Sequence, residues 1–471
     1  MKENMQEKPF NFAESGFSLG PVPVPDPEEV YGRLKRCVNS NTGIVKHLYP
    51  LTLYPSDPNF FKYSTIVCSA NRFSGLAPNS QINGGAGLTP TLAKLAAIGE
   101  ALERYSSSLY DEKELVRSTF RKLSERIPSQ HILQPECLEL FSPSQYQQPD
   151  FPFVPFHEDL ETFWTWTYCM IQNRPVLAPA ALVYLPYVFR KKEENFTYNT
   201  STGLAFSYSL ESAILGGIYE SIERDAIMIM WYNRLMFPLV DLQDVPDDVE
   251  SYLSSRFRLF KRERIHCVDV TTDIGVPVFF TVITGDGYPH EPPLAVGAAC
   301  RLNPVECFLK STMEGFQTYA WARYLKQEKE ITRDGMGEFR VSGFDKHVQF
   351  YTREENYEKA KFCFSSPKRV KLGGLPDLDT RDVYGNLMKA VELVKKAGFP
   401  HLLIKDVTSE DVRTLGGYVA RVVIPKTVPL NMGTTRRFLA VRRIYDVPFK
   451  IGMRPSPTSP ADLNPDPHPF P

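Results

Sequence analysis

Three glycine-containing turns in this chain each lead into a helical run that carries two oxygen-bearing side chains three residues apart. Residues at positions i and i+3 share one face of a helix, so each run presents its pair on one side. The pairs are Glu100 with Glu103, Glu220 with Glu223, and Glu314 with Gln317. The recurrence predicts three helices that offer their polar pairs to a common site.

Two interpretations of the glutamate pairs are open. An arginine, Arg104 or Arg224, follows each first glutamate by four residues. Such i,i+4 pairs stabilise solvent-exposed helices by roughly 0.2–0.5 kcal/mol each. Taken singly, each pair would therefore be read as a solvated helix face.

Apolar neighbours favour the second interpretation, in which the glutamates lie beside a buried stripe. The apolar positions are Leu95, Ile98 and Leu102 in the first run, and Ile214, Leu215, Ile218 and Ile222 in the second. Buried carboxylates need cations or hydrogen bonds, and Mg²⁺ prefers carboxylate and phosphate oxygens. We therefore expect a multi-carboxylate metal–nucleotide site.

Four segments of the chain resemble, in the same order, the signatures of the YcaO-domain family. They are GGAGLTPTLAKLAAIGEALERYSS, STGLAFSYSLESAILGGIYESIERDA, CVDVTTDIGVPVFFTVI with VGAACRLNPVECFLKSTMEGFQT, and RVVIPKTVPLNMG. The likeness covers roughly residues 27–471. YcaO enzymes use ATP and Mg²⁺ to activate backbone amides of peptides. Most of those in natural-product pathways are cyclodehydratases that turn Cys, Ser or Thr into thiazolines and oxazolines.

The resemblance implies a role for each polar pair. The four glutamates of the first two helices (Glu100, Glu103, Glu220 and Glu223) are expected to hold Mg²⁺. Glu314 and Gln317 are expected to support the nucleotide. Arg323 is a candidate phosphate clamp, with Arg301 as the alternative. No G-x-x-x-x-G-K-[ST] motif occurs, so a P-loop is excluded as the ATP cradle.

The chain ends in a P-x-P-x-P element with a further proline at position 471. Composition alone would make this a disordered polyproline tail. The resemblance implies instead a stiff segment that reaches back to the ATP site, as in azoline-forming members. The Pro471 carboxylate and His468 are then candidate catalytic groups that move protons. Thioamide-forming relatives usually lack this ending, so it favours azoline chemistry.

Composition excludes several other classes of protein. The net charge is −1 and no long basic run occurs, so neither a nucleic acid nor an anionic membrane surface is expected as a partner. Eight cysteines without a C-x-x-C pair indicate buried thiols in a reducing cytoplasm, and neither a zinc site nor a disulfide framework. No signal peptide and no apolar run long enough for a membrane span are present.

Strands alternate with helices along the chain, which predicts an α/β (mixed α+β) architecture, the YcaO fold, with two or three subdomains in 471 residues. We expect an N-terminal tail over 1–26, a YcaO domain over 27–454 and a proline-rich tail over 455–471. Paired strands are predicted at 164–171 and 176–183, and an amphipathic helix at 249–264.

Several positions depart from the family pattern. Ala96 stands where the first helix usually carries Ser, and Ala86 where the glycine turn often contains Lys. Before the second helix, Ser207 and Ser212 replace the usual Gly and Glu, with Glu211 alongside. These differences concern nucleotide contacts more than the glutamate pairs.

The resemblance also implies partners. The substrate would be a ribosomally made precursor peptide with core Cys, Ser or Thr, as in thiazole/oxazole-modified microcin and bacteriocin biosynthesis. Only about 26 residues precede the expected domain, so a separate E1-like (ThiF-like) protein is expected to bind the leader. An FMN dehydrogenase is a plausible third member, and family members are often homodimers.

Two alternatives to a cyclodehydratase stay open. One is a YcaO enzyme that makes thioamides or amidines, against which the terminal prolines argue. The other is a catalytically weak scaffold subunit that binds the precursor peptide, which Ala96 and Ser212 keep open.

Overall fold

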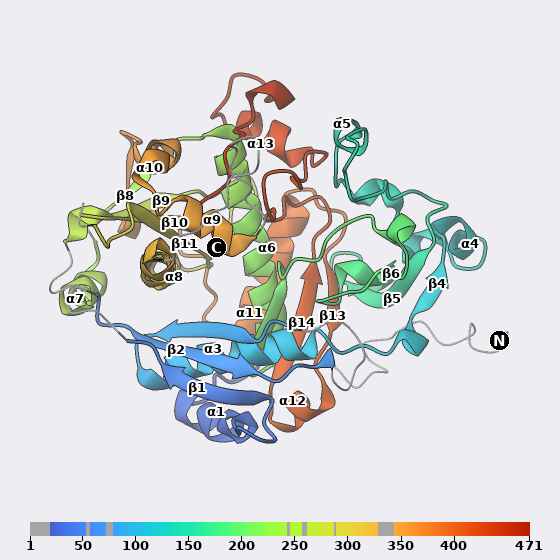
Figure 1. Ribbon diagram of the computed structural model, residues 1–471, viewed down its shortest axis with the longest axis horizontal. Coiled ribbons are helices and arrows are strands. Elements are labelled where there is room, and N and C mark those ends of the chain that lie inside the picture. The colour runs from blue at the N-terminus through green and yellow to red at the C-terminus, as the bar shows by residue number, and fades with distance from the viewer. Residues whose placement is uncertain are drawn as a thin grey trace.

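The computed structural model describes residues 19–52, 57–71, 79–242, 245–256, 261–286, 289–327 and 343–471 (Figure 1). Its α-helices are α1 (Pro27–Leu34), α3 (Pro90–Ser106), α4 (Phe120–Ser124), α5 (Pro143–Tyr146), α6 (Leu210–Asn233), α7 (Asp247–Arg256), α8 (Pro304–Gln327), α9 (Phe344–Phe350), α10 (Glu354–Ala360), α11 (Val383–Lys396), α12 (Glu410–Thr414) and α13 (Arg443–Lys450). Its strands are β1 (Val45–Pro50), β2 (Phe61–Val67), β3 (Ile82–Gly87), β4 (Val116–Ser118), β5 (Thr162–Cys169), β6 (Arg174–Pro179), β7 (Leu204–Ser207), β8 (Leu239–Asp241), β9 (Ile265–Asp269), β10 (Val278–Thr284), β11 (Leu294–Cys300), β12 (Arg369–Lys371), β13 (Leu403–Asp406) and β14 (Tyr418–Val423).

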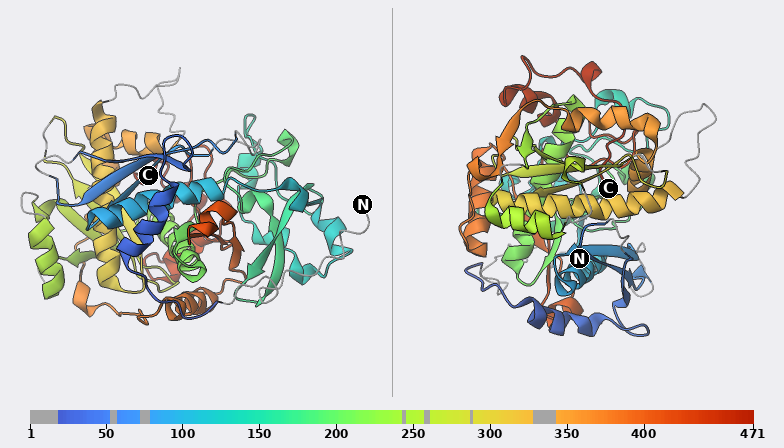
Figure 2. Two further views of the ribbon diagram at one scale, coloured as in Figure 1. Left: turned by 90° about the horizontal axis from the view of Figure 1, so that it is seen from below. Right: turned by 90° about the vertical axis from the view of Figure 1, so that its left-hand side faces the viewer.

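The described strands form three sheets. One has the order β1-β2-β3, a second β11-β10-β9-β8-β12, and a third β4-β5-β13-β14-β7 with β6 paired to β5. Among these pairings β8 with β12 is parallel, and the others are antiparallel. Figure 2 shows the β4–β6 region (teal) and the β8–β11 region (olive) at opposite ends of the molecule, with the first sheet (blue) on one side between them.

Helix α6 is the central element and connects the sheets. It packs on β7 and β14 on one side and on β10 and β11 on another, and also contacts α11 and α13. Figure 1 shows it upright in the middle of the molecule. Most of its residues are buried, among them Ile214, Ile218 and Ile222, because a helix that is apolar nearly all round is stable only inside a core.

Three strand–helix units form a ring around the predicted site. Each glutamate-bearing helix packs on the strand that precedes it, giving the units β3–α3, β7–α6 and β11–α8. Each helix also contacts the strand of another unit: α3 contacts β7, α6 contacts β11, and α8 contacts β3. The ring therefore brings together three segments that are far apart in the sequence.

Most elements expected from the sequence are found, with shifted ends. The predicted strand 164–171 corresponds to β5, while its partner β6 ends at Pro179 and a short 3₁₀ helix follows. Of the helix predicted over 249–264, residues up to Arg256 belong to α7 (Asp247–Arg256), and residues 257–260 lie outside the described residues. The prediction is wrong at its end, since residues 262–264 form a 3₁₀ helix. Residues 1–18 of the expected N-terminal tail lie outside the described residues.

All eight cysteines are free thiols, most of them buried. Burial raises the pKa of the Cys37 and Cys267 thiols to about 12, so they are unreactive near neutral pH. In the part of the chain that the structure describes, no helix is both long and apolar enough to cross a membrane.

Candidate active site

Each unit of the ring begins its helix with a polar cap. Thr89 Oγ1 accepts a hydrogen bond from the Leu92 N–H before α3, and Ser209 Oγ accepts one from the Ser212 N–H before α6. Asn303 Oδ1 plays the same part before α8. Such caps satisfy N–H groups that have no partner within the helix, so the three helices begin at fixed points after their strands.

Two glycines allow strand and helix to approach closely. A Cβ atom on Gly85 would lie 2.2 Å from the backbone nitrogen of Ala97, and one on Gly297 would lie 2.1 Å from that of Gly315. Any larger residue would push α3 from β3 or α8 from β11. The glycine turns seen in the sequence therefore set the spacing of the site.

The first glutamate of each pair is held by the backbone of its own unit. Glu100 Oε2 accepts a hydrogen bond of 3.0 Å from the Gly84 N–H. Glu220 Oε2 accepts one of 2.9 Å from the Gly203 N–H. The two contacts are equivalent in the two units: each orients one carboxylate oxygen, while the other oxygen faces the arginine four residues later on the same helix.

The second glutamate of each pair is the more buried one. Burial, with Glu220 and Glu100 nearby, raises the pKa of Glu103 to about 8 although Arg104 opposes the change. Burial together with Glu314 likewise raises the pKa of Glu223 to about 7 against the effect of Arg224. A buried carboxylate of this kind gains most from a bound cation.

The two arginines differ in how fully they are satisfied. Arg104 contacts Glu103 through Nη1 and lies 3.6 Å from Glu100. Arg224 Nη2 lies 3.4 Å from Glu220 Oε1, but its Nε and Nη1 are buried and have no hydrogen-bond partner among the described residues. Buried N–H donors without partners are costly and suit an anionic ligand such as a phosphate.

The third pair completes the ring from α8. Glu314 is partly exposed, lies 3.4 Å from Lys310 and is close enough to Glu223 to affect its pKa. Gln317 approaches the first unit, since a Cβ atom on Gly84 would lie 3.4 Å from its Nε2. The structure thus brings together all six residues of the predicted pairs.

Arg421 on β14 was not among the residues predicted for the site. Its Nε donates to the Leu182 carbonyl and its Nη1 to the Thr200 carbonyl. Burial lowers its pKa to about 10, and the neighbouring Glu220 and Glu103 oppose that change. Arg421 is the first residue of the RVVIPKTVPLNMG segment, which is the one sequence signal that could have found it.

A cavity adjoins the glutamates on the side of Arg421. Its lining includes Arg421, Ser221, Tyr198, Ile424 and Phe438. Ser221 follows Glu220 directly on α6, and the N–H of Val422 donates to the carbonyl of Gly203. Two separate elements, α6 and β14, therefore place the cavity next to the site.

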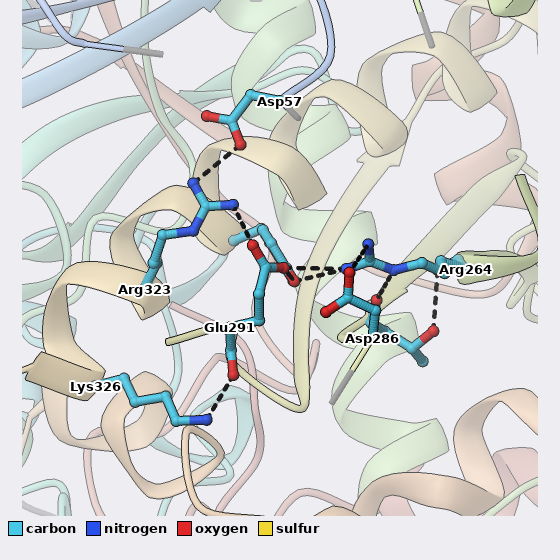
Figure 3. A network of polar contacts seen from close by, with 8 residues as sticks. Asp57, Arg264, Asp286, Glu291, Arg323 and Lys326 are labelled. Carbon is cyan, nitrogen blue, oxygen red and sulfur yellow. Dashed lines mark hydrogen bonds and ion pairs between the residues drawn. The ribbon is translucent and has the colours of Figure 1, made fainter. Parts of the chain in front are cut away.

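Arg323, the predicted phosphate clamp, lies in a different set of contacts. Its Nη1 is 3.0 Å from Asp57 and its Nη2 is 2.9 Å from Glu291 (Figure 3). Glu291 is also bound by Arg264 and accepts from Tyr319. Both guanidinium ends of Arg323 thus face carboxylates, so the structure gives it a role in joining α8 to neighbouring loops. Arg301, the alternative, packs over Tyr219 at 5.0 Å.

The C-terminal segment packs back into the centre of the molecule, where Figure 1 marks the C-terminus. Phe470 is buried, and the Arg224 guanidinium lies 4.3 Å from its ring centroid. Pro471 is half-buried. His468 is fully buried, with its Nε2 2.9 Å from the Asn431 carbonyl and its ring stacked on His347. These contacts hold the C-terminal segment in place. Proton transfer by His468 or Pro471 stays a prediction.

The residues that depart from the family pattern have structural roles. The Cβ of Ala96 faces Gly85 at the contact of α3 with β3, and Ala86 is buried in β3. Ser207 pairs with Tyr418 across the sheet. Glu211 is buried and accepts a hydrogen bond from the Gly20 N–H.

The site fits a nucleotide with Mg²⁺ by the chemistry of its donors. Within the described ranges, no three carboxylate, imidazole or thiol groups lie close enough to hold a metal ion by themselves. Mg²⁺ bound with a nucleotide needs only one or two carboxylates, since phosphate oxygens and waters complete its shell. Glu103 and Glu223 would supply carboxylates, and the Arg224 donors that have no hydrogen-bond partner would supply a contact for phosphate.

The ring of three strand–helix units brings carboxylates together at a place that suits Mg²⁺ bound with a nucleotide, and the chain has no P-loop. Residues 84–428 match the model of the family described as YcaO cyclodehydratase, ATP- and Mg²⁺-binding. The match covers most of the chain, and the chain belongs to this family. The predictions of the family, of the mixed α/β fold and of ATP and Mg²⁺ as cofactors are thereby confirmed.

Similar proteins have also been found among curated and solved proteins. An uncharacterized protein of Methanothermobacter thermautotrophicus is 26% identical over 366 residues, which are 75% of this chain and 84% of that protein. A heterocyclase solved with substrate and cofactor has a TM-score of 0.76 at 23% identity. The alignment covers 97% of this chain and 60% of the heterocyclase, so this chain spans less than two thirds of that protein.

Two further structures share the fold at lower identity. The YcaO protein of Methanopyrus kandleri, solved with AMPPCP and Mg²⁺, has a TM-score of 0.61 at 17% identity, with 89% of this chain and 96% of that chain covered. A chain of the E. coli microcin synthetase McbBCD complex has a TM-score of 0.54 at 16% identity, with 80% and 87% covered.

Proposed function

We propose that this protein is an ATP-dependent cyclodehydratase that converts Cys, Ser or Thr of a precursor peptide into thiazoline or oxazoline. The observation that carries the proposal is the ring of three units, which holds two buried glutamates, Glu103 next to Arg104 and Glu223 next to the incompletely satisfied Arg224. Membership of the YcaO cyclodehydratase family supports it, as does the fold shared with a heterocyclase.

The protein's own groups would divide the work as follows. Glu103 and Glu223 would contribute carboxylates to Mg²⁺, while Glu100 and Glu220, fixed by glycine N–H groups, would set the geometry around it. Glu314 and Gln317 would support the nucleotide from α8. Arg224 would donate the N–H groups that have no hydrogen-bond partner to phosphate oxygens, a charge-assisted contact.

The reaction needs a good leaving group in place of an amide oxygen. When bound, ATP with Mg²⁺ supplies a γ-phosphoryl group for that oxygen and the positive charge that stabilises its transfer. In the net reaction the peptide's side-chain nucleophile closes on the preceding carbonyl carbon, and the elements of water leave with the phosphate. The enzyme's residues position the groups and exclude bulk water.

The peptide would enter through the cavity beside Arg421. Its lining combines polar and apolar side chains with the charged Arg421, and one of its lining residues, Ser221, directly follows Glu220. The substrate amide can then meet the nucleotide site without crossing the core.

A separate E1-like leader-binding protein is the partner we propose, with an FMN dehydrogenase as a further member and a homodimer as a possible assembly. The E. coli microcin synthetase with the related fold was solved as the McbBCD complex, which supports action within a complex.

The test is the mass of a Cys- and Ser-rich precursor peptide after incubation with the protein, its leader-binding partner, ATP and Mg²⁺. Cyclodehydration removes one water mass per ring, and this loss should disappear in Glu103→Ala and Glu223→Ala. Exchange of oxygen for sulfur would indicate a thioamide-forming enzyme instead. An unchanged mass without ATP consumption, while peptide still binds, would establish a scaffold, the alternative raised by Ala96 and Ser212.

A further inference from the structure

The C-terminal segment, residues 464–471, is held mainly through its carbonyl groups. Its four prolines have no N–H, so carbonyl oxygens are the main backbone groups that can be bound. Donors from four side chains reach four of these carbonyls: Arg437 to Asn464, Trp231 to Asp466, Tyr351 to Pro467, and His347 to His468, at 2.8, 2.9, 2.6 and 2.9 Å. The last of these bonds is the one nearest to Phe470.

His347 on α9 uses both ring nitrogens. Its Nε2 lies 2.9 Å from the backbone nitrogen of Gly433, which can only donate. Nε2 must therefore accept, and the proton of the neutral ring is on Nδ1, where it is donated to the carbonyl of His468. A second proton on His347 would place two donors against each other at Gly433.

His468 is locked against the same ring. Its Nε2 lies 2.9 Å from the Asn431 carbonyl, and the two imidazoles are stacked with centroids 3.9 Å apart and an interplanar angle of 18°. Both rings are buried. A positive charge on either would lie in the core and against the face of the other.

The charged groups around His347 and His468 do not remove the cost of protonating either buried ring. Asp345, on the same helix as His347, favours its protonated form, while Arg224 opposes protonation of His468. Asp466 is already paired with Arg234 and Lys359. Burial outweighs these effects, lowering the pKa of His347 to about 4 and that of His468 well below its usual range.

We infer that His347 is a positioning residue which seats the C-terminal segment, and that Phe470 is held over Arg224 only while His347 and His468 are both neutral. The consequence for catalysis rests on the proposed function, whereas the seating itself does not. His347 acts through His468 and Phe470 on the guanidinium that contacts Glu220.

The sign of the pH dependence follows from linkage. Histidines that are neutral when seated and titrate near 6.5 when released stabilise the seated state above pH 6.5 and lose that contribution as the pH falls toward 4. Between these pH values, the equilibrium constant for seating the C-terminal segment falls about tenfold per pH unit for one such histidine and about a hundredfold for two. Seating is therefore complete above neutral pH and weakens steadily in acid.

The experiment follows the Gly433 amide, which is bonded directly to His347. Hydrogen exchange of full-length protein, corrected for the intrinsic pH dependence, is measured from pH 5 to 8 in the wild type, in His347→Gln and in His401→Gln. His401 is a matched control, since burial also lowers its pKa but it lies beside Cys169. Dehydration of the precursor peptide is followed over the same range.

The expected result is loss of Gly433 protection below pH 6.5 in the wild type and in His401→Gln, and a distinctly shallower profile in His347→Gln, where only His468 still titrates. The rate of peptide dehydration should fall over the same pH range in which the Gly433 amide loses protection. The fall should appear in kcat, while KM for ATP stays unchanged. Protection that is constant with pH in the wild type, or that follows the wild-type profile in His347→Gln, would overturn the inference. Protection that changes as expected in a protein without dehydratase activity would support the seating and refute the proposed function.

Discussion

The guanidinium of Arg224 lies over the ring of Phe470, 4.3 Å from its centroid, and at the same time reaches Glu220 with its Nη2. One side chain thus contacts both a residue of the C-terminal segment and a glutamate of the proposed Mg²⁺ site. The position of this guanidinium depends on Phe470 from one side and on the carboxylate from the other.

Replacing Phe470 is expected to affect turnover more than nucleotide affinity. Phe470→Leu keeps an apolar group but removes a cation–π contact of about 0.5–2 kcal/mol, so kcat should fall while KM for ATP stays within about twofold, a change of less than about 0.5 kcal/mol. Steady-state kinetics of peptide dehydration would measure both. Phe449→Leu is the control, because Phe449 is 51% exposed. Equal losses in the two variants would contradict the prediction.

The ligand-free protein should lose stability as the pH rises. The pKa of Glu103 is raised to about 8 in the fold by burial, so its protonated form stabilises the fold, and this contribution is lost between about pH 4.5 and 8. Glu103→Gln removes the contribution of Glu103 to this pH dependence, while that of Glu223 remains. Thermal unfolding at several pH values should therefore show a flatter profile for Glu103→Gln than for the wild type, and no flattening for the exposed Glu358→Gln.

Binding of Mg²⁺ with a nucleotide should release protons. Glu103 and Glu223, with pKa values raised to about 8 and about 7, must ionise to coordinate a cation, so about one proton should leave per site at pH 7. Calorimetry of Mg²⁺–nucleotide binding in buffers of different ionisation enthalpy measures this number. A heat that is independent of the buffer would contradict the assignment of these two glutamates.

Arg323 is expected to matter for stability and not for nucleotide binding. Arg323→Gln leaves Asp57 and Glu291 without their shared cation, and removing one partner of a buried ion pair costs about 3–5 kcal/mol. Thermal unfolding should show this loss, while KM for ATP stays within about twofold. Arg381→Gln, in an exposed ion pair with Asp377, should cost far less. A large rise in KM would restore the phosphate-clamp prediction.

Arg421 is expected to act through its charge. Its guanidinium favours the ionised form of Glu103, so Arg421→Gln should raise the pKa of Glu103 further and shift the acid limb of the pH–rate profile upward. Arg421→Lys keeps a charge and should shift that limb less. The measurement is the rate of peptide dehydration as a function of pH at saturating ATP. An unchanged acid limb in Arg421→Gln would show that the charge of Arg421 does not affect the site.

The glutamate pairs were predictable because their spacing is local. An i,i+3 pattern on an apolar helix is readable from the sequence, and the glycines that bring strand and helix together precede each run. The hydrogen bonds from Gly84 and Gly203 to Glu100 and Glu220 follow from the same short segments.

Contacts between distant segments were not predictable in this way. Arg421 joins the site because β14 pairs with β7, about 200 residues earlier in the chain. Arg323 has the residue type of a phosphate ligand, but the side chain faces Asp57 and Glu291, which no pattern near it indicates. His347 lies in a short helix that carries no family signature, and only the fold brings it to His468.

The ring of three units also has a consequence for biosynthesis. Its first strand begins at Ile82 and its last helix ends at Gln327, and the ring closes where α8 meets β3. Contacts between segments so far apart in sequence form late, because closing a long loop costs entropy before any contact repays it. A nascent chain can have a folded first sheet and still lack a nucleotide site. Capacity to bind ATP therefore reports that folding of the whole ring is complete.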